Sequence, residues 1–382
     1  MSKELKTIVQ RDDLLRALRD VKPAVSRTAT LPVLSNVLLT KAGKALTIAA
    51  SNLDLVIVTQ VAATGRGKWS LSVPMVTLLD LVDLLPSESV TLVFEEARQI
   101  LQVLCEGVKA TLKGIDGAEF PILPSPGKSC WLEMPGAEWG QMARQVGAMA
   151  ATDGARPTLS GMKMAVGEDG RLELAATDGF RLARLVRPGV AAAAQSVIIP
   201  GQPLAEVAKL AARADSVRIE VQESRVLFDM GSVQVGCPLV EGQYPDYEAV
   251  IPTEPKTAVR FDRAMLREAF QVVNVVAREG NYTVRLELVD SREAGLLAQV
   301  MAMAQTVGDG CREVPLALEH GGEAMTVAVN GRYMDKALKL LGEEAVLVEL
   351  TSPMLPLVIR PVDYELEGEL VYVVMPMSMN GN

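Results

Sequence analysis

Apolar positions along this chain recur with two different periods. From Asp12 to Val25 they recur every three to four residues, with Leu14, Leu15, Leu18 and Val21 on one stripe. That spacing predicts an amphipathic helix with one buried face. Between stretches of this kind, apolar and polar residues alternate singly, as they do in half-buried strands. The pattern therefore predicts helices packed on antiparallel sheet.

Three copies of this pattern follow one another at an interval of about 125 residues. The first copy places Leu34–Asn36 before the strand pattern Leu46–Asn52, and the second places Leu159–Gly161 before Leu172–Asp178. The third is weaker but in register, with a strand pattern that opens at Val284. Each copy begins with a predicted helix, over residues 12–25, 137–150 and 263–278.

A second helix closes each copy. Its start is marked by Val73-Pro74, Ile199-Pro200 and Val329-Asn330, because proline suits a first helical turn and asparagine caps one. Each copy then ends in a proline-containing segment that we expect to be an edge or exit strand; these segments are 120–124, 244–252 and 373–377. We predict an α+β fold of three repeated domains, each with two helices on an antiparallel sheet. The expected boundaries are 1–124, 125–252 and 253–382.

The distribution of charge changes what the composition implies. A net charge of −9 argues against nucleic acid as a partner, because non-specific affinity comes from Lys and Arg. The six predicted helices, however, carry twelve cations and nine anions, a net charge of +3, which leaves −12 for the remainder. A mildly basic helical layer without aromatic stacking residues would touch phosphates without reading bases. For any one helix alone, a solvated face is the alternative.

The sequence offers little for catalysis, metal or cofactor binding. The four cysteines lie at least 25 residues apart, and His320 is the one histidine, so neither a Cys-x-x-Cys pair nor a histidine-based metal site is expected. Asp178-Gly179 is typical of a turn. We find no leader peptide and no run of 18 apolar residues, which indicates a cytoplasmic protein. From these residues alone, an enzyme with an interdomain-cleft active site and a repeat-built interaction module not acting on DNA both stay open.

Five motifs in order resemble the bacterial DNA polymerase III beta subunit, or β sliding clamp, family. They are Thr30–Asn36, Ala176–Ala183, Tyr244–Tyr247, Asn330–Tyr333 and Val373–Met377. The resemblance runs from about residue 5 to 379. It implies a DNA-clamp fold, a head-to-tail homodimer that closes a ring around duplex DNA, and a non-catalytic processivity factor for the replicative polymerase. It also implies a groove between the second and third domains that binds short linear peptides of polymerase, clamp loader and repair factors.

Carried over motif by motif, the groove would consist of Leu159, Thr177, Gly179, Arg181, Leu182, Pro245, Val250, Asn330, Tyr333, Val374, Met375, Pro376 and Met377. The set is largely apolar, and its flexible methionine pair suits several partners. The commoner fate of a run such as Val373–Met377 is a buried terminal strand. Phe180, Glu248-Ala249 and Ser378–Asn382 depart from the family pattern, which points to a divergent or phage-borne member with its own peptide preference.

The same resemblance places the helices around the DNA. The candidate DNA-facing cations are Arg16, Arg19, Lys22, Arg27, Arg144, Lys209, Arg213, Arg267, Lys336 and Lys339. For the dimer interface we expect a first-domain strand edge with Val108, Ala110 and Leu112 against the third-domain helix at Val275 and Val276. Two adjacent valines late in a charged helix are candidates for its apolar contact, since a head-to-tail interface that closes makes a ring.

Overall fold

The three predicted copies share one order of elements. The computed structural model describes residues 4–26, 31–86, 88–125, 127, 130–291 and 295–378. Along these residues the order strand, helix, four strands, helix, three strands occurs three times, with β9 and β22 as short additions. This order confirms the α+β repeat with two helices per copy.

Contacts group the chain into two compact units, which we describe separately. Unit 1 consists of Met1–Gly140 and Gln202–Leu239, and unit 2 of Gln141–Gly201 and Val240–Asn382. The division runs through the second copy. The boundaries expected near residues 124 and 252 therefore stay predictions.

Unit 1 is built on one antiparallel sheet of 13 strands among the described residues. The main path runs β10-β15-β16-β17-β4-β1-β6-β7-β8, with β2, β3, β5 and β9 joined to it through β4. The strands are β1 (Glu4–Gln10), β2 (Asn36–Ala42), β3 (Ala45–Ser51), β4 (Val56–Thr64), β5 (Trp69–Pro74), β6 (Ser89–Glu95), β7 (Ile100–Cys105), β8 (Val108–Lys113), β9 (Ile115–Asp116), β10 (Leu132–Pro135), β15 (Ser216–Val221), β16 (Arg225–Asp229) and β17 (Val233–Pro238).

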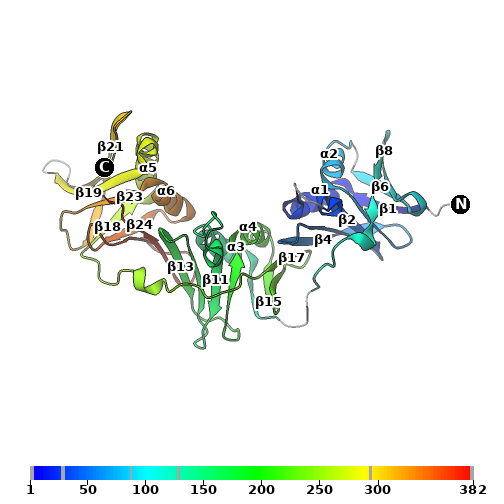
Figure 1. The fold of residues 1–382 in the computed structure, drawn as a ribbon, viewed down its shortest axis with the longest axis horizontal. Helices are drawn as coiled ribbons and strands as arrows, with labels where there is room; N and C mark the ends of the chain where they lie inside the picture. Colours follow the sequence, from blue (N-terminus) through cyan, green and yellow to red (C-terminus); the bar gives the residue numbers. More distant parts are fainter. Residues whose placement is uncertain are drawn as a thin grey trace. The chain divides into compact units, whose positions relative to one another are not determined.

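Helices α1 (Arg11–Val21) and α2 (Met75–Asp83) lie side by side in unit 1 (Figure 1). On α1 the predicted stripe is buried, with Leu14, Leu18 and Val21 fully enclosed. The helix is shorter than predicted and ends at Val21, because the following residues form a 3-10 turn that contains Pro23. Helix α3 (Gly136–Gly147) begins in unit 1 and ends in unit 2, whereas α4 (Gly201–Ala211) falls in unit 1 after its first residue.

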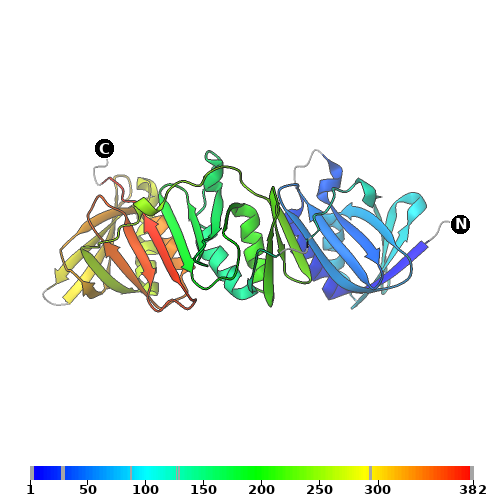
Figure 2. The ribbon, with the colours of Figure 1, turned by 90° about the horizontal axis from the view of Figure 1, so that it is seen from below.

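Unit 2 contains two antiparallel sheets. The larger one has the order β14-β11-β12-β13-β26-β25-β24-β18-β22, and the smaller one β21-β20-β19-β23 (Figure 2). The strands of the larger sheet are β11 (Gly161–Val166), β12 (Leu172–Thr177), β13 (Arg181–Arg187), β14 (Gln195–Pro200), β18 (Thr257–Asp262), β22 (Ala317–His320), β24 (Ala345–Leu350), β25 (Leu357–Pro361) and β26 (Glu369–Val374). Those of the smaller sheet are β19 (Thr283–Ser291), β20 (Gly295–Ala304), β21 (Gly308–Pro315) and β23 (Thr326–Asn330).

Two helices of unit 2 begin at side-chain caps. Asp262 accepts a hydrogen bond from the Met265 N–H at the start of α5 (Arg263–Ala277), and Asn330 accepts one from the Arg332 N–H at the start of α6 (Gly331–Leu340). The predicted asparagine cap is confirmed. The prolines act differently from our expectation. Pro74 and Pro200 end β5 and β14, and their helices begin one residue later.

The proline-containing ends of the copies are not edge strands. Residues 120–124 form no strand, and the segment from Tyr244 to Pro252 contains only a 3-10 turn at Glu248–Val250. At the third end, Val373 and Val374 belong to β26, which is paired on both sides, and Pro376 follows the strand. Proline cannot donate to a ladder, so the first two ends form no strand, and in the third end β26 stops before Pro376.

The buried stripe of α1 predicts a marked loss of stability on truncation. Leu18→Ala should lower the free energy of unfolding by about 2 to 5 kcal/mol, because a fully enclosed leucine leaves a cavity. Val76→Ala on α2 is the matched control, since Val76 is exposed, and it should change stability by less than about 0.5 kcal/mol. Urea unfolding followed by circular dichroism measures both; equal midpoints would mean that α1 is not docked as described.

Candidate functional site

Pairing of β13 with β26 brings the motifs of the second and third copies together. Arg181 lies opposite Val374, and Leu182 lies opposite Val373. Two segments that are far apart in the sequence thus become neighbouring strands of one sheet, green and red in Figure 2. Both strands, and the residues that surround them, lie within unit 2.

The turn from Thr177 to Arg181 is held by side chains. The Asp178 carboxylate accepts hydrogen bonds from the N–H groups of Phe180 (2.9 Å) and Arg181 (3.1 Å) and forms an ion pair with the Arg181 guanidinium (2.9 Å). Gly179 has φ +89°, a conformation that favours glycine. The predicted Asp-Gly turn is confirmed, and the Asp178 carboxylate is occupied in holding it.

Residues 375–377 run beside this turn. The Met375 N–H donates to the Phe180 carbonyl (2.9 Å), and the Met377 N–H donates to the Ala328 carbonyl (2.7 Å). Pro376 bridges to Val329. The backbone is therefore fixed, while the Met375 and Met377 side chains remain half-buried.

Arg181 lies close to two residues of α6, Tyr333 and Lys336. The Arg181 guanidinium lies 4.6 Å from the ring centroid of Tyr333, within the range of a cation–π interaction. Lys336, which we expected on the DNA face, is half-buried near Arg181, and its pKa is lowered by burial and then by the Arg181 charge. The structure thus places Lys336 beside the groove residues.

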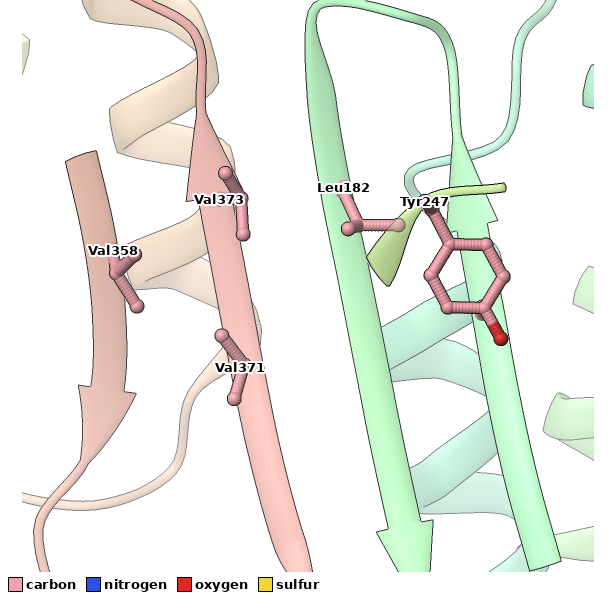
Figure 3. Close-up of a cluster of buried hydrophobic side chains, with 6 residues drawn as sticks. Leu182, Tyr247, Val358, Val371 and Val373 are labelled. Carbon is pink, nitrogen blue, oxygen red and sulfur yellow. The ribbon is translucent and has the colours of Figure 1, made fainter. Parts of the chain in front are cut away.

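A strap, residues 244–251, covers one face of the larger sheet. Tyr247 is buried in a cluster with Leu182, Val358, Val371 and Val373 (Figure 3). The neighbouring Tyr244 packs edge-on against Tyr247, with ring centroids 5.9 Å apart. The two tyrosines thereby anchor the strap, which leaves Pro245 and Val250 exposed at the surface.

Polar contacts to residues of the larger sheet also hold the strap. The Thr177 N–H donates to the Tyr244 hydroxyl (3.1 Å), and Lys163 Nζ donates to the Tyr247 hydroxyl (3.1 Å). Burial raises the pKa of Tyr244 to about 12, so its hydroxyl keeps its proton at neutral pH. Glu173 in turn pairs with Arg184 (2.5 Å) and Lys163 (3.7 Å). The charges beneath the strap are paired, as buried charges must be.

The structure brings most of the candidate groove residues into one region but buries some of them. The buried ones are Leu159, Thr177, Leu182 and Val374; the half-buried ones are Arg181, Asn330, Tyr333, Met375, Pro376 and Met377; the exposed ones are Gly179, Pro245 and Val250. Val374 is buried in a strand with a partner on each side, as the buried-strand alternative expects, and its place in a peptide groove stays a prediction. Leu182 is core, in contact with the strap.

Sequence reasoning missed the loop before β25. Met354 and Leu355 are exposed, Met354 at 76%. Leu357, the first residue of β25, pairs with Val374, the last residue of β26, so this loop enters the sheet at the end where residues 375–377 leave it. Phe180, also exposed, completes this apolar rim. The sequence signal was weak, because a Ser-Pro turn within an apolar run is ordinary loop chemistry.

The candidate DNA-facing cations are distributed over both units. Those that are exposed on or next to helices are Arg16, Arg19, Lys22, Arg144, Lys209, Arg213 and Lys339. Arg267 is half-buried and pairs with Asp335 on α6 (3.0 Å). Arg27 lies outside the described residues. Several of these cations have an acidic partner, which the sequence did not reveal.

The candidate dimer residues lie at a strand edge and on a helix face. Strand β8 ends the sheet path of unit 1; Val108 and Ala110 are half-buried and Leu112 is buried. On α5, Val275 is exposed, Val276 is half-buried, and Val272 adds a further exposed valine. Strand β21, the edge of the smaller sheet, packs against the same helix.

Among the described residues, no helix is long and apolar enough to cross a membrane. No group of three or more His, Cys, Asp or Glu side chains in that part of the chain has the arrangement of a metal site.

Known protein families match this chain along nearly its whole length. Profiles of the N-terminal, central and C-terminal domains of the DNA polymerase III beta subunit match residues 5–124, 133–246 and 248–378. A beta sliding clamp from Synechococcus elongatus is 31% identical, covering 98% of this chain and 100% of its own length. The chain belongs to the DNA polymerase III beta subunit family.

Solved structures agree with this assignment. A sliding clamp from Pseudomonas aeruginosa, crystallised with griselimycin, is 27% identical, with a TM-score of 0.88 over 99% of this chain and 100% of that one. The clamp from Bacillus subtilis has a TM-score of 0.89 at 23% identity, which shows the shared fold. As a beta subunit, this chain has its apolar rim on residues of both the central profile (Phe180) and the C-terminal profile (Met354 and Leu355).

The two methionines of this beta subunit should be separable from its fold. The double variant Met375→Ala, Met377→Ala should lower the affinity for a bound peptide by about tenfold or more. The reason is that a Leu or Phe side chain of the peptide gains on the order of 1.5 to 3 kcal/mol from burial against these methionines. The probe is a fluorescent C-terminal peptide of the host's replicative polymerase. Met265→Ala, at an exposed methionine on α5, is the matched control. Unchanged peptide binding together with a large fall in melting temperature would show that both methionines are core.

Proposed function

We propose that this chain is a DNA sliding clamp, a processivity factor that encircles duplex DNA and tethers the replicative polymerase. The observation that carries the proposal is the consecutive match of all three beta-subunit domain profiles along the chain. The family is a non-catalytic subunit of the polymerase. The Asp178 carboxylate fits that role, since it is held in an ion pair and turn hydrogen bonds.

The rim on unit 2 supports a groove for short linear peptides. Phe180, Val250, Met354 and Leu355 are exposed, and Met375 and Met377 are half-buried in the segment that follows β26. Single apolar side chains on a peptide would be buried there, whereas Arg181 and Asn330 offer polar orientation. The flexible methionines suit partners of differing sequence. Polymerase, clamp loader and repair factors would share this groove, and the P. aeruginosa relative binds griselimycin.

Three clamp domains with boundaries at 1–124, 125–252 and 253–382 are part of the proposal, as is a cytoplasmic location. Two chains would associate head to tail into a ring. The supporting features are a free sheet edge at β8 in unit 1, and a second edge, β21, beside the exposed valines of α5 in unit 2. Exposed edges invite strand pairing unless they are covered.

The topology of the DNA tests the proposal. Loaded by its clamp loader onto nicked circular DNA, the protein should remain bound, and it should be lost when the circle is cut, because a ring slides off free ends. Gel filtration of the complex before and after linearisation measures this. Equal retention on circles and linear fragments would contradict a clamp and favour an ordinary DNA binder. No association with either form would favour an enzyme or an interaction module that does not act on DNA.

The dimer has its own test. Val275→Asp with Val276→Asp should give monomers, because two charges would be placed in an apolar contact. Sedimentation equilibrium at micromolar concentration measures the state of both proteins. Val76→Asp, at an exposed valine on α2, should leave the dimer intact. A wild-type protein that sediments as a monomer would remove the support for a two-chain ring.

A further inference from the structure

The helix face of unit 1 carries a compact group of arginines and aspartates. A depression of about 510 Å³ is lined by Arg11, Arg16, Arg19, Arg213, Asp12, Asp20 and Asp83, together with Leu15. These residues come from α1, from the end of α2 and from the turn after α4. Arg16, Arg19 and Arg213 are also among the candidate DNA-facing cations.

Each of these three arginines has an aspartate partner. Arg19 pairs with Asp83 (2.9 Å), and Arg213 pairs with Asp20 (2.7 Å). Arg16 pairs with Asp13 (2.5 Å), and Arg11 pairs with Asp12 (2.8 Å). Four guanidinium groups and four carboxylates therefore cancel. The basic layer predicted from the sequence is neutral at this place.

We propose that Asp20 and Asp83 compete with DNA phosphates for Arg213 and Arg19, and so keep the clamp's contact with DNA weak. This inference rests on the proposed function, because it concerns the face that would surround the duplex. An arginine that turns to a phosphate leaves its carboxylate unpaired and close to a second negative charge. The exchange replaces one ion pair by another and adds a repulsion, so the gain is small.

Burial shows which partner holds its place. The side chains of Arg19 and Arg213 are 58% and 56% exposed, so their guanidinium groups can reach a ligand in solvent. The Asp20 side chain is only 12% exposed and is anchored on α1. Asp83, at 50% exposure, reaches Arg19 from the last residue of α2. Asp20 is thus the fixed member of its pair and Arg213 the exposed one, whereas Arg19 and Asp83 are exposed to a similar degree.

The arrangement differs from an ordinary DNA-binding face. When unpaired Lys and Arg side chains contact phosphates, they displace the counterions that are condensed on the DNA. The affinity for DNA is then high at low salt and falls steeply as the salt concentration rises. Arginines that already hold carboxylates contribute less to both quantities. Lys22, one residue beyond α1, is exposed and forms no ion pair with any described residue.

The experiment compares charge changes of equal size at different places. Asp20→Asn, Asp83→Asn and the double variant remove the competing carboxylates and keep an acceptor oxygen. Asp169→Asn is the matched control, because Asp169 pairs with Arg171 at the hairpin tip between β11 and β12, in unit 2. The measurement is fluorescence anisotropy of a labelled short linear duplex, titrated with full-length protein over a series of salt concentrations.

We expect the double variant to bind the duplex about tenfold more tightly than wild type at low salt. The slope of log K against log salt should become more negative by about two, since roughly 0.9 is added for each phosphate neutralised. Adding Arg19→Gln and Arg213→Gln to the double variant should reverse both changes. The Asp169→Asn control should leave the slope unchanged.

Affinities of the single variants Asp20→Asn and Asp83→Asn that equal the affinity of the Asp169→Asn control would overturn the inference. Because Asp20 is mostly buried, melting temperatures are recorded for every variant, and Asp83→Asn alone, at an exposed carboxylate, provides the test if Asp20→Asn fails to fold. Retention on circular DNA is measured in parallel. Wild-type retention with no effect of the aspartate changes would reject the competition alone, whereas lack of retention would reject the clamp function.

Discussion

The antiparallel pairing of β13 with β26 is the interaction on which the candidate groove depends. It places Leu182 opposite Val373 and continues one sheet from the second copy into the third. Side chains alternate faces along a strand, so a slip of one residue would move Val371 and Val373 out of the buried cluster. The apolar cost of that slip fixes the register. The turn at Asp178 and the methionines after Val374 are neighbours because the register is fixed.

The pairing of β13 with β26 also forms an apolar sheet face, which the strap covers. The sheet face that carries Leu182, Val358 and Val373 is apolar, and the Tyr244–Ile251 segment covers it. Tyrosine suits this position because it buries a large ring and keeps a polar tip. Lys163 reaches the tip of Tyr247, and Glu173 balances the lysine. The exposed strap residues Pro245 and Val250 are therefore positioned by this network. Substitutions in the network would shift them without removing any contact to a bound peptide.

The sequence predicted the local structure well and the long-range structure poorly. Helical spacing identified the buried stripe of α1 because Leu14 and Leu18 are four residues apart in one element. The fate of Val374 could not be read in this way, since its partners, Arg181 and Leu357, lie in other strands. Met354 and Leu355 were missed for the same reason. Their place at the end of the sheet where β26 ends follows from strand register, which spacing along one segment does not contain.

Charge was the least predictable property, and it decides how the helix face would work. Counting residues gave a net positive helical layer, but Asp83 stands 64 residues from Arg19 and Asp20 stands 193 from Arg213. Those pairs exist only in the folded chain. A protein held on DNA by a closed ring needs no strong local affinity, and strong local affinity would oppose sliding. In the proposed clamp, neutralised arginines on DNA-facing helices and an apolar peptide groove would be complementary: the closed ring would retain the DNA, and the groove would supply the binding energy for partners.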